Sequence, residues 1–172
     1  TEIRQTLERG SDLLLATNRP TGQLTIRGRL LEADWQRVHE AIDYGRRNAL
    51  VKRRKLNVLI ESPMASFSPH QLALLDEQAT ISIPMFLPDA SQNTEAAVDD
   101  ALVSIQTTFS REENPEVILR VSPSGTEALV KTWSKAVAYG VRRLRIEFNP
   151  ALVWTAEDQQ HFAAALHDIA EQ

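Results

Sequence analysis

The chain of 172 residues has no cysteine. It cannot form a disulfide, and it offers no thiolate to a metal ion, to an iron–sulfur cluster or to a covalent mechanism. Long hydrophobic runs are also missing, since none approaches the roughly 18 residues that a membrane-spanning helix needs, so we expect no membrane insertion. An excess of positive charge is absent too. The 19 Lys and Arg against 23 Asp and Glu leave a net charge of −4, which argues against general nucleic-acid binding.

The remaining composition is that of a folded protein. A hydrophobic fraction of 42% with a charged fraction of 24% excludes a disordered chain. The length suits a single α/β domain over residues 1–172 with a sizeable core. Residues 1–4 do not begin the basic and then apolar pattern of a secretory signal, so we expect a cytoplasmic protein. The start at Thr suggests a fragment of a longer protein.

Short apolar runs alternate along the chain with segments of helical periodicity. The predicted strands are Leu24–Leu31, Leu56–Glu61, Thr80–Met85, Glu116–Val121 and Arg143–Phe148. The predicted helices are Ile3–Ala16, Ala33–Asn48, Pro69–Glu77, Glu95–Phe109, Glu127–Tyr139 and Ala156–Ala170. Ser68, Ser124 and Thr155 are expected to cap the N-termini of three of these helices, and Gly140 is expected to end the helix Glu127–Tyr139.

The alternation predicts an N-terminal helix followed by five βα units in a mostly parallel, flavodoxin-like or receiver-like layer. An irregular solenoid similar to leucine-rich repeats is the alternative, because residues 141–149 have the spacing of such a repeat. The irregular spacing of the strands disfavours it. The first and last strands alternate apolar residues with arginine, which is typical of edge strands or of a sheet face left open for a partner.

A dense basic cluster lies between the first βα helix and the second strand, and consists of Arg46, Arg47, Lys52, Arg53, Arg54 and Lys55. Such a cluster can hold a phosphate, a nucleotide or an acidic partner. Its other interpretation is a solvated helix C-terminus, where the helix dipole favours cations. We select Arg46, Arg47, Arg53 and Arg54 as candidate ligand-binding residues.

A second group of arginines lies on the polar faces of predicted strands. The group comprises Arg27, Arg29, Arg120, Arg143 and Arg145. Together with Glu147 these residues are candidates for an interaction surface, because arginine binds phosphate and carboxylate groups through two N–H donors at once. In the alternative, the arginines pair with Glu116 and Glu147 across neighbouring strands.

The loop Ser122–Thr126 joins a strand to the N-terminus of the next helix, which is a suitable place for an anion. Ser122, Ser124 and Gly125 are therefore candidate ligand residues, although helix capping explains the same loop. It matches neither of the two common glycine-rich phosphate motifs. Glu61 and Asn149 also fall at strand carboxyl ends, where an enzyme of this architecture would place its site.

Histidine spacing gives no sign of a metal site. The four histidines, at positions 39, 70, 161 and 167, form neither an HxH nor an HExxH pattern. No nucleophile elbow supports a serine triad either. We therefore select no catalytic residue, no metal ligand and no cofactor.

Several segments between residues 20 and 112 resemble the degenerate receiver-like domain of the cyclic-di-GMP-sensing protein of bacterial cellulose secretion. The segments are Arg46-Arg47, Asn57–Glu61, Ala65–Phe67, the helix with Leu72, Leu74 and Leu75, Ile83-Pro84 and Phe109–Arg111. The resemblance implies a non-catalytic regulatory module of a bacterial cell. No site residue of that family is carried over, and two further βα units follow the similar region.

These observations give a first hypothesis: a non-enzymatic regulatory or assembly module. Its partner would be another protein or another domain of the same chain, with self-association as a further option. The alternative is a domain that binds a phosphate or nucleotide ligand, or an enzyme, with its site at the strand carboxyl ends. A third alternative is the binding surface of a repeat protein.

Overall fold

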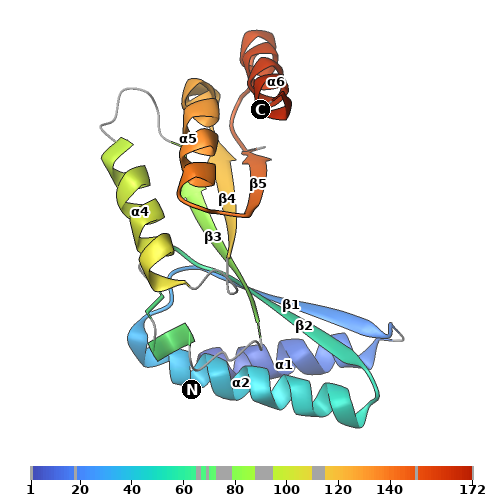
Figure 1. Ribbon diagram of the computed structural model, residues 1–172. Coiled ribbons are helices and arrows are strands. Elements are labelled where there is room, and N and C mark those ends of the chain that lie inside the picture. The colour runs from blue at the N-terminus through green and yellow to red at the C-terminus, as the bar shows by residue number, and fades with distance from the viewer. Residues whose placement is uncertain are drawn as a thin grey trace. The chain divides into compact units, whose positions relative to one another are not determined.

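A computed structural model describes residues 2–17, 19–64, 67–68, 70–72, 79–87, 95–109, 115–149 and 151–171. The strands are β1 (Thr21–Arg27), β2 (Lys55–Glu61), β3 (Thr80–Phe86), β4 (Glu116–Val121) and β5 (Arg143–Phe148) (Figure 1). The helices are α1 (Glu2–Ala16), α2 (Glu32–Val51), α4 (Glu95–Thr108), α5 (Thr126–Ala138) and α6 (Ala156–Ala170). A short 3₁₀ turn, η2 (Pro123–Gly125), precedes α5.

The five strands are parallel and form one sheet, alternating with helices along the chain. This confirms the predicted α/β layer. The strand order, which the sequence left open, is sequential: β1-β2-β3-β4-β5. No helix in the described part of the chain is long and apolar enough to cross a membrane.

Two compact units divide the chain, and the division falls within β3. We name residues 1–82 the N-terminal unit and residues 83–172 the C-terminal unit, and describe each by itself. That residues 1–172 form a single domain stays a prediction.

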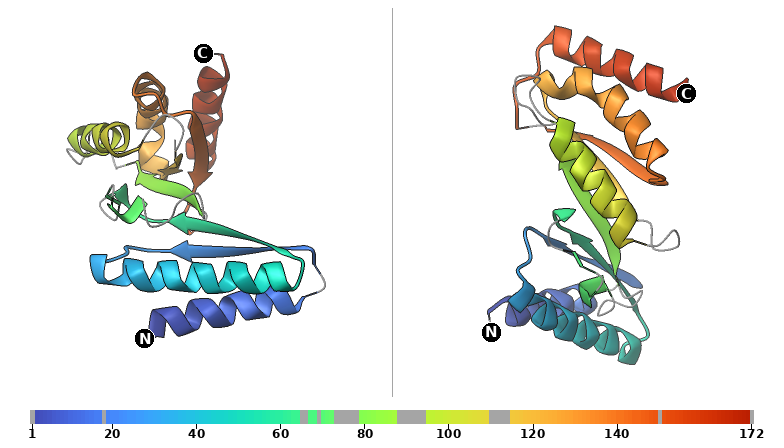
Figure 2. Two further views of the ribbon diagram at one scale, coloured as in Figure 1. Left: turned by 60° about the horizontal axis from the view of Figure 1, so that its bottom comes forward. Right: turned by 60° about the vertical axis from the view of Figure 1, so that its left-hand side comes forward.

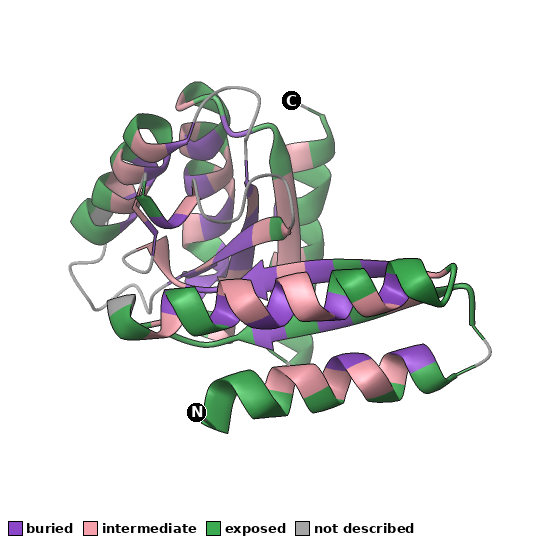
Figure 3. Cartoon of the chain, turned by 90° about the horizontal axis from the view of Figure 1, so that it is seen from below, coloured by how far each residue is buried: buried purple, intermediate pink, exposed green. Residues whose placement is uncertain are grey.

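In the N-terminal unit, β1 and β2 pair along their whole length, from Thr21 opposite Lys55 to Arg27 opposite Glu61. Helices α1 and α2 lie side by side against this pair (Figures 1 and 2). Apolar side chains at alternate strand positions meet the helices and form the buried layer that Figure 3 colours purple. Its buried members include Leu24, Ile26, Leu56, Val58, Ile60, Trp35, Val38 and Ile42.

One glycine lets α1 and α2 approach closely. A Cβ atom at Gly45 of α2 would lie 2.7 Å from the Ser11 Oγ of α1 and 2.8 Å from the Leu56 Cδ2 of β2. Ser11 is fully buried, and its hydroxyl donates to the Leu7 carbonyl at 3.0 Å. The absence of a side chain at Gly45 therefore determines how tightly this part of the unit can pack.

In the C-terminal unit, β4 and β5 pair in register from Glu116 opposite Arg143 to Val121 opposite Phe148. Helices α5 and α6 pack together (Figure 2). An ion pair joins Lys135 Nζ of α5 to both carboxylate oxygens of Asp99 in α4, at 2.9 Å each. The core of this unit is apolar, and its buried members include Val98, Leu102, Ile105, Val117, Ile118, Leu119, Val121 and Leu129.

Most predicted elements appear within a few residues of their expected bounds, and the differences have local causes. The first strand ends at Arg27 and not at Leu31, because Gly28 adopts a φ of 125° and turns the chain. The capping box expected at Ser124 is absent, since η2 precedes α5 and Gly125 occupies the N-cap position. The predicted helix Pro69–Glu77 lies mostly outside the described residues.

Two predicted helix ends are confirmed. Thr155 and Asp158 form a capping box at the start of α6: Asp158 N donates to Thr155 Oγ1 at 3.1 Å, and Thr155 N donates to Asp158 Oδ2 at 2.8 Å. Gly140 follows α5 with a φ of 84°, the left-handed conformation expected of a glycine after a helix.

Candidate site at the carboxyl ends of β3, β4 and β5

A cleft of about 400 Å³ opens in the C-terminal unit where β3, β4 and β5 end. Backbone pairing continues past the strands, because Leu87 N donates to Arg120 O at 2.9 Å and Asn149 N donates to Val121 O at 3.2 Å. These bonds hold the loop residues at the strand ends. The cleft is lined by Phe86, Leu87, Arg120, Val121, Ser122, Glu147, Phe148, Asn149 and Leu152.

An ion pair forms the polar centre of the cleft. Arg120 and Glu147 are directly opposite in the β4–β5 register, and Arg120 Nε donates to Glu147 Oε2 at 3.2 Å. The Arg120 guanidinium carbon lies 5.5 Å from the centroid of the Phe86 ring, which is a cation–π distance. The packing against Phe86 and the bond to Glu147 together hold this guanidinium in place.

The charges continue along the same face of β4 and β5. Arg145 NH2 lies 3.3 Å from a carboxylate oxygen of Glu147 and 3.3 Å from one of Glu116. Arg120 and Arg145 thus pair across strands, as the second interpretation of the strand arginines expected. Arg143 is exposed and has no ion pair with the described residues.

Aromatic side chains border the polar centre. Phe86 is 67% exposed and Phe148 is 56% exposed, although both line a cleft. Phe148 meets the Trp154 ring edge-on at 6.1 Å, and Trp154 Nε1 donates to the Asn149 carbonyl at 3.0 Å. Exposed aromatic faces beside charged groups are typical of a ligand site.

Three residues of the loop after β4 were selected as ligand candidates, namely Ser122, Ser124 and Gly125. Of these, only Ser122 lines the cleft. Ser124 is exposed, with its Oγ 3.3 Å from the Ser122 Oγ. Gly125 is buried, and a Cβ atom there would come within 2.9 Å of the Leu87 carbonyl oxygen. Gly125 therefore permits the close packing of this loop against the residue after β3, and does not line the cleft.

A matching ion pair ends β1 and β2 in the N-terminal unit. Arg27 Nε donates to Glu61 Oε2 at 3.1 Å, and these two residues are also directly opposite in register. The Glu61 side chain is only 2% exposed. Arg29 is not on a strand face as predicted, because β1 ends at Arg27 and Arg29 lies exposed in the following loop.

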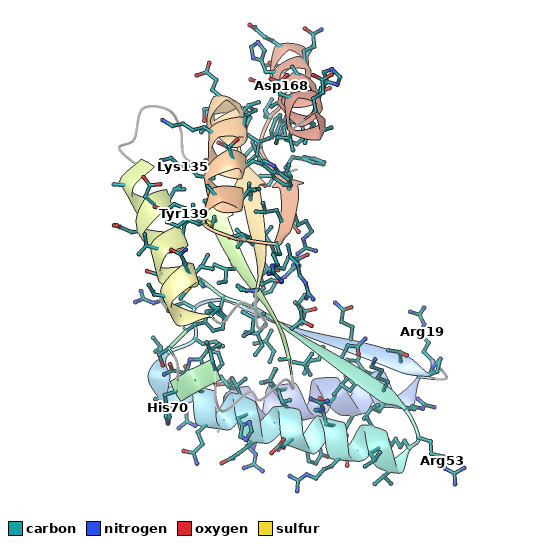
Figure 4. All side chains as sticks on the ribbon, in the orientation of Figure 1. Arg19, Arg53, His70, Lys135, Tyr139 and Asp168 are labelled. Carbon is teal, nitrogen blue, oxygen red and sulfur yellow. The ribbon has the colours of Figure 1, made fainter. Side chains whose placement is uncertain are left out.

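The basic cluster divides into two parts. Arg46, Arg47, Arg54 and Lys55 line a separate groove of about 940 Å³ in the N-terminal unit. Arg53 adopts a φ of 53° and extends outward at the end of α2 (Figure 4). Among the described residues, no group of three His, Asp or Glu side chains could hold a metal ion.

Sequence reasoning missed the apolar half of the cleft, namely Phe86, Leu87, Phe148 and Leu152. The available signal was the position of the two phenylalanines, because Phe148 ends a predicted strand and Phe86 directly follows another. A phenylalanine there is expected to project from the end of the sheet and not into its centre.

The fold and the cleft define an α/β protein whose candidate site is at the carboxyl ends of parallel strands. No family model and no curated protein matches the chain. Solved structures share its fold, among them the following two. One is native anSMEcpe with bound AdoMet and Kp18Cys peptide, with a TM-score of 0.72 and 13% identity over 96% of this chain and 51% of that chain. The other is native anSMEcpe with bound AdoMet, with a TM-score of 0.72 and 12% identity over 96% and 50%.

The chain therefore spans about half the length of the solved chains that it matches. This comparison makes the hypothesis of a non-enzymatic regulatory or assembly module wrong, because the similar structures hold AdoMet, an enzyme cofactor. The hypothesis rested on the lack of a catalytic motif, and a cleft assembled from three strand ends leaves no local motif. The resemblance to a receiver-like domain stays a prediction.

Proposed function

We propose that the chain is part of an enzyme and binds AdoMet, or a ligand with the same adenosine group, in the cleft at the ends of β3, β4 and β5. The observation that carries this proposal is the likeness over 96% of the chain to structures with bound AdoMet. The position of the cleft agrees with it, because enzymes built from successive parallel βα units place their sites at the strand carboxyl ends.

The chemistry of the cleft is suitable for such a ligand. Phe86 and Phe148 offer exposed aromatic side chains for a purine, and stacking on an aromatic ring contributes about 1–3 kcal/mol per base. Glu147 and Asn149 offer oxygen acceptors for hydroxyl or ammonium groups. Arg120 offers a positive charge for a carboxylate. The volume of about 400 Å³ lies in the range of small-molecule sites.

The reaction is limited by what the chain lacks. When bound, AdoMet supplies group-transfer or radical chemistry, and the radical reactions rely on iron–sulfur clusters held by cysteine thiolates. This chain has no cysteine, so its own residues cannot hold such a cluster. We therefore propose that the residues of the cleft bind and orient the ligand, and we assign no radical step to them.

The test is calorimetric titration of the chain with AdoMet, adenosine and methionine. We expect AdoMet and adenosine to bind and methionine alone to bind weakly, because the aromatic walls suit the purine. Glu147→Gln should weaken AdoMet binding by about tenfold or more, the value of one charge-assisted hydrogen bond. Glu116→Gln is the matched control, because Glu116 also pairs with Arg145 but does not line the cleft.

A second pair of variants separates stacking from charge. Phe148→Ala should weaken the binding of both AdoMet and adenosine. Val153→Ala should weaken the binding of neither, since Val153 is 88% exposed and does not line the cleft. Thermal unfolding of each variant verifies that it is folded. Absence of AdoMet and adenosine binding to a folded chain, or equal effects of Glu147→Gln and Glu116→Gln, would refute this proposal.

A further inference from the structure

The groove of the N-terminal unit contains a strand edge with which no other described strand pairs. Strand β2 pairs with β1 along all seven of its residues, but it pairs with β3 only at Leu59, Ile60 and Glu61. Within the described part of the chain, residues 55–58 of β2 have no strand on their second edge. The backbone groups of such an edge can pair with another extended chain.

Positive charge surrounds this edge. The groove takes Arg46 and Arg47 from α2, Arg54 from the residue before β2, and Lys55 from the first position of β2. No acidic residue is among its described lining. Arg46 and Lys55 form no side-chain hydrogen bond or ion pair with the described residues. Two of the four cations are thus available to an anionic ligand.

The other two cations are held in position by backbone carbonyls. Arg54 NH1 donates to the Leu15 and Thr17 carbonyls at the end of α1. Arg47 Nε donates to the Asp43 carbonyl at 3.3 Å. Neither contact neutralises the charge, because a carbonyl oxygen is not an anion. The groove therefore keeps four positive charges in a chain whose net charge is −4.

We infer that this groove binds an extended acidic peptide segment, which adds a strand to the edge of β2 and places carboxylates beside Arg46 and Arg47. The strand edge favours a peptide over a nucleic acid, since only a polypeptide backbone offers matching N–H and C=O groups. The volume of about 940 Å³ accommodates several residues. This inference is independent of the proposed function, because the residues and the ligand are different.

The experiment uses synthetic eight-residue peptides labelled with a fluorophore and measures binding to the full chain by anisotropy. The probe alternates glutamate and valine, and the control alternates lysine and valine. The alternating glutamate peptide should bind at least tenfold more tightly than the lysine peptide. Two further probes carry backbone N-methyl groups on one or the other set of alternate residues. Methylation of one of the two sets should abolish binding. The reason is that alternate residues of a strand in a parallel sheet form their backbone hydrogen bonds with the same neighbouring strand.

The double variant Arg46→Ala/Arg47→Ala should weaken binding of the glutamate peptide by about tenfold or more. Arg142→Ala/Arg143→Ala is the matched control, with the same loss of charge at two exposed residues of the C-terminal unit, and should leave binding unchanged.

Several results would overturn the inference. They are tolerance of both methylation patterns, equal binding of the lysine peptide, and equal effects of the two double variants. Self-association that depends on Arg46 and Arg47 without peptide binding would instead assign the groove to a second copy. Tighter binding of a single-stranded oligonucleotide than of the glutamate peptide would assign it to nucleic acid.

Discussion

Replacement of Gly45 by alanine tests the packing that positions the groove. Gly45 directly precedes Arg46 and Arg47 in α2. Its missing side chain allows α2 to approach Ser11 of α1 and Leu56 of β2. Alanine is normally favoured over glycine within a helix by roughly 0.5–1 kcal/mol. At this position the new methyl group would instead meet buried atoms at 2.7 and 2.8 Å.

Comparison with a second glycine isolates the cost of the close contact. Gly10 of α1 is also helical, but a Cβ atom there would lie 3.5 Å from Leu24 Cδ1, an ordinary contact. Gly10→Ala should therefore stabilise the chain by up to about 1 kcal/mol. Overpacking a filled core costs roughly 1–3 kcal/mol, so Gly45→Ala should be about 1–3 kcal/mol less stable than Gly10→Ala.

The assay is urea unfolding of the two variants beside the parent chain. A variant with Ser11→Ala added to Gly45→Ala should recover part of the lost stability, because it removes the Oγ at 2.7 Å but leaves the Cβ at 3.1 Å. If Gly45→Ala stabilised the chain as much as Gly10→Ala, the reasoning about the α1–α2 contact would be refuted.

Two further predictions concern the C-terminal unit. The hydrogen bonds from Thr155 hold the pKa of Asp158 below its ordinary value of 3.8; the cap therefore stabilises the chain above about pH 3.8 and loses this effect as the pH falls further. Thr155→Ala should flatten that part of a plot of melting temperature against pH, and an unchanged slope would contradict the assignment. Phe162→Ala removes a ring 5.5 Å from Trp154 and should cost roughly 1–2 kcal/mol with a weaker near-ultraviolet circular dichroism signal. Leu166→Ala, at a residue 37% exposed in the same helix, is the control, and equal losses would contradict a specific aromatic contact.

The elements were predictable because local patterns and helix-end signals agree along most of the chain. The strands Glu116–Val121 and Arg143–Phe148 and the helix Ala156–Ala170 have their predicted bounds. The error at the first strand came from Leu30 and Leu31, whose apolar character extended the predicted strand beyond Gly28. The positive φ of Gly28 ends that strand, and hydrophobic periodicity carries no signal for it.

The site was predictable only in part. Ion pairing of Arg120 and Arg145 with Glu147 and Glu116 follows from alternation on neighbouring strands, so the sequence could raise it as an alternative. The cleft depends on which strands are neighbours and on where each of them ends. Because Phe86 and Phe148 are 62 positions apart in the sequence, no local pattern could place them around one cleft.

The most direct test of the central proposal is to follow backbone and side-chain amide resonances of the chain while AdoMet is added. The account predicts saturable shifts at Leu87, Ser122, Phe148 and Asn149 of the C-terminal unit. Glu147→Gln should reduce these shifts, and Glu116→Gln should leave them unchanged. Absence of saturable shifts, or shifts confined to residues outside the cleft, would contradict the proposal.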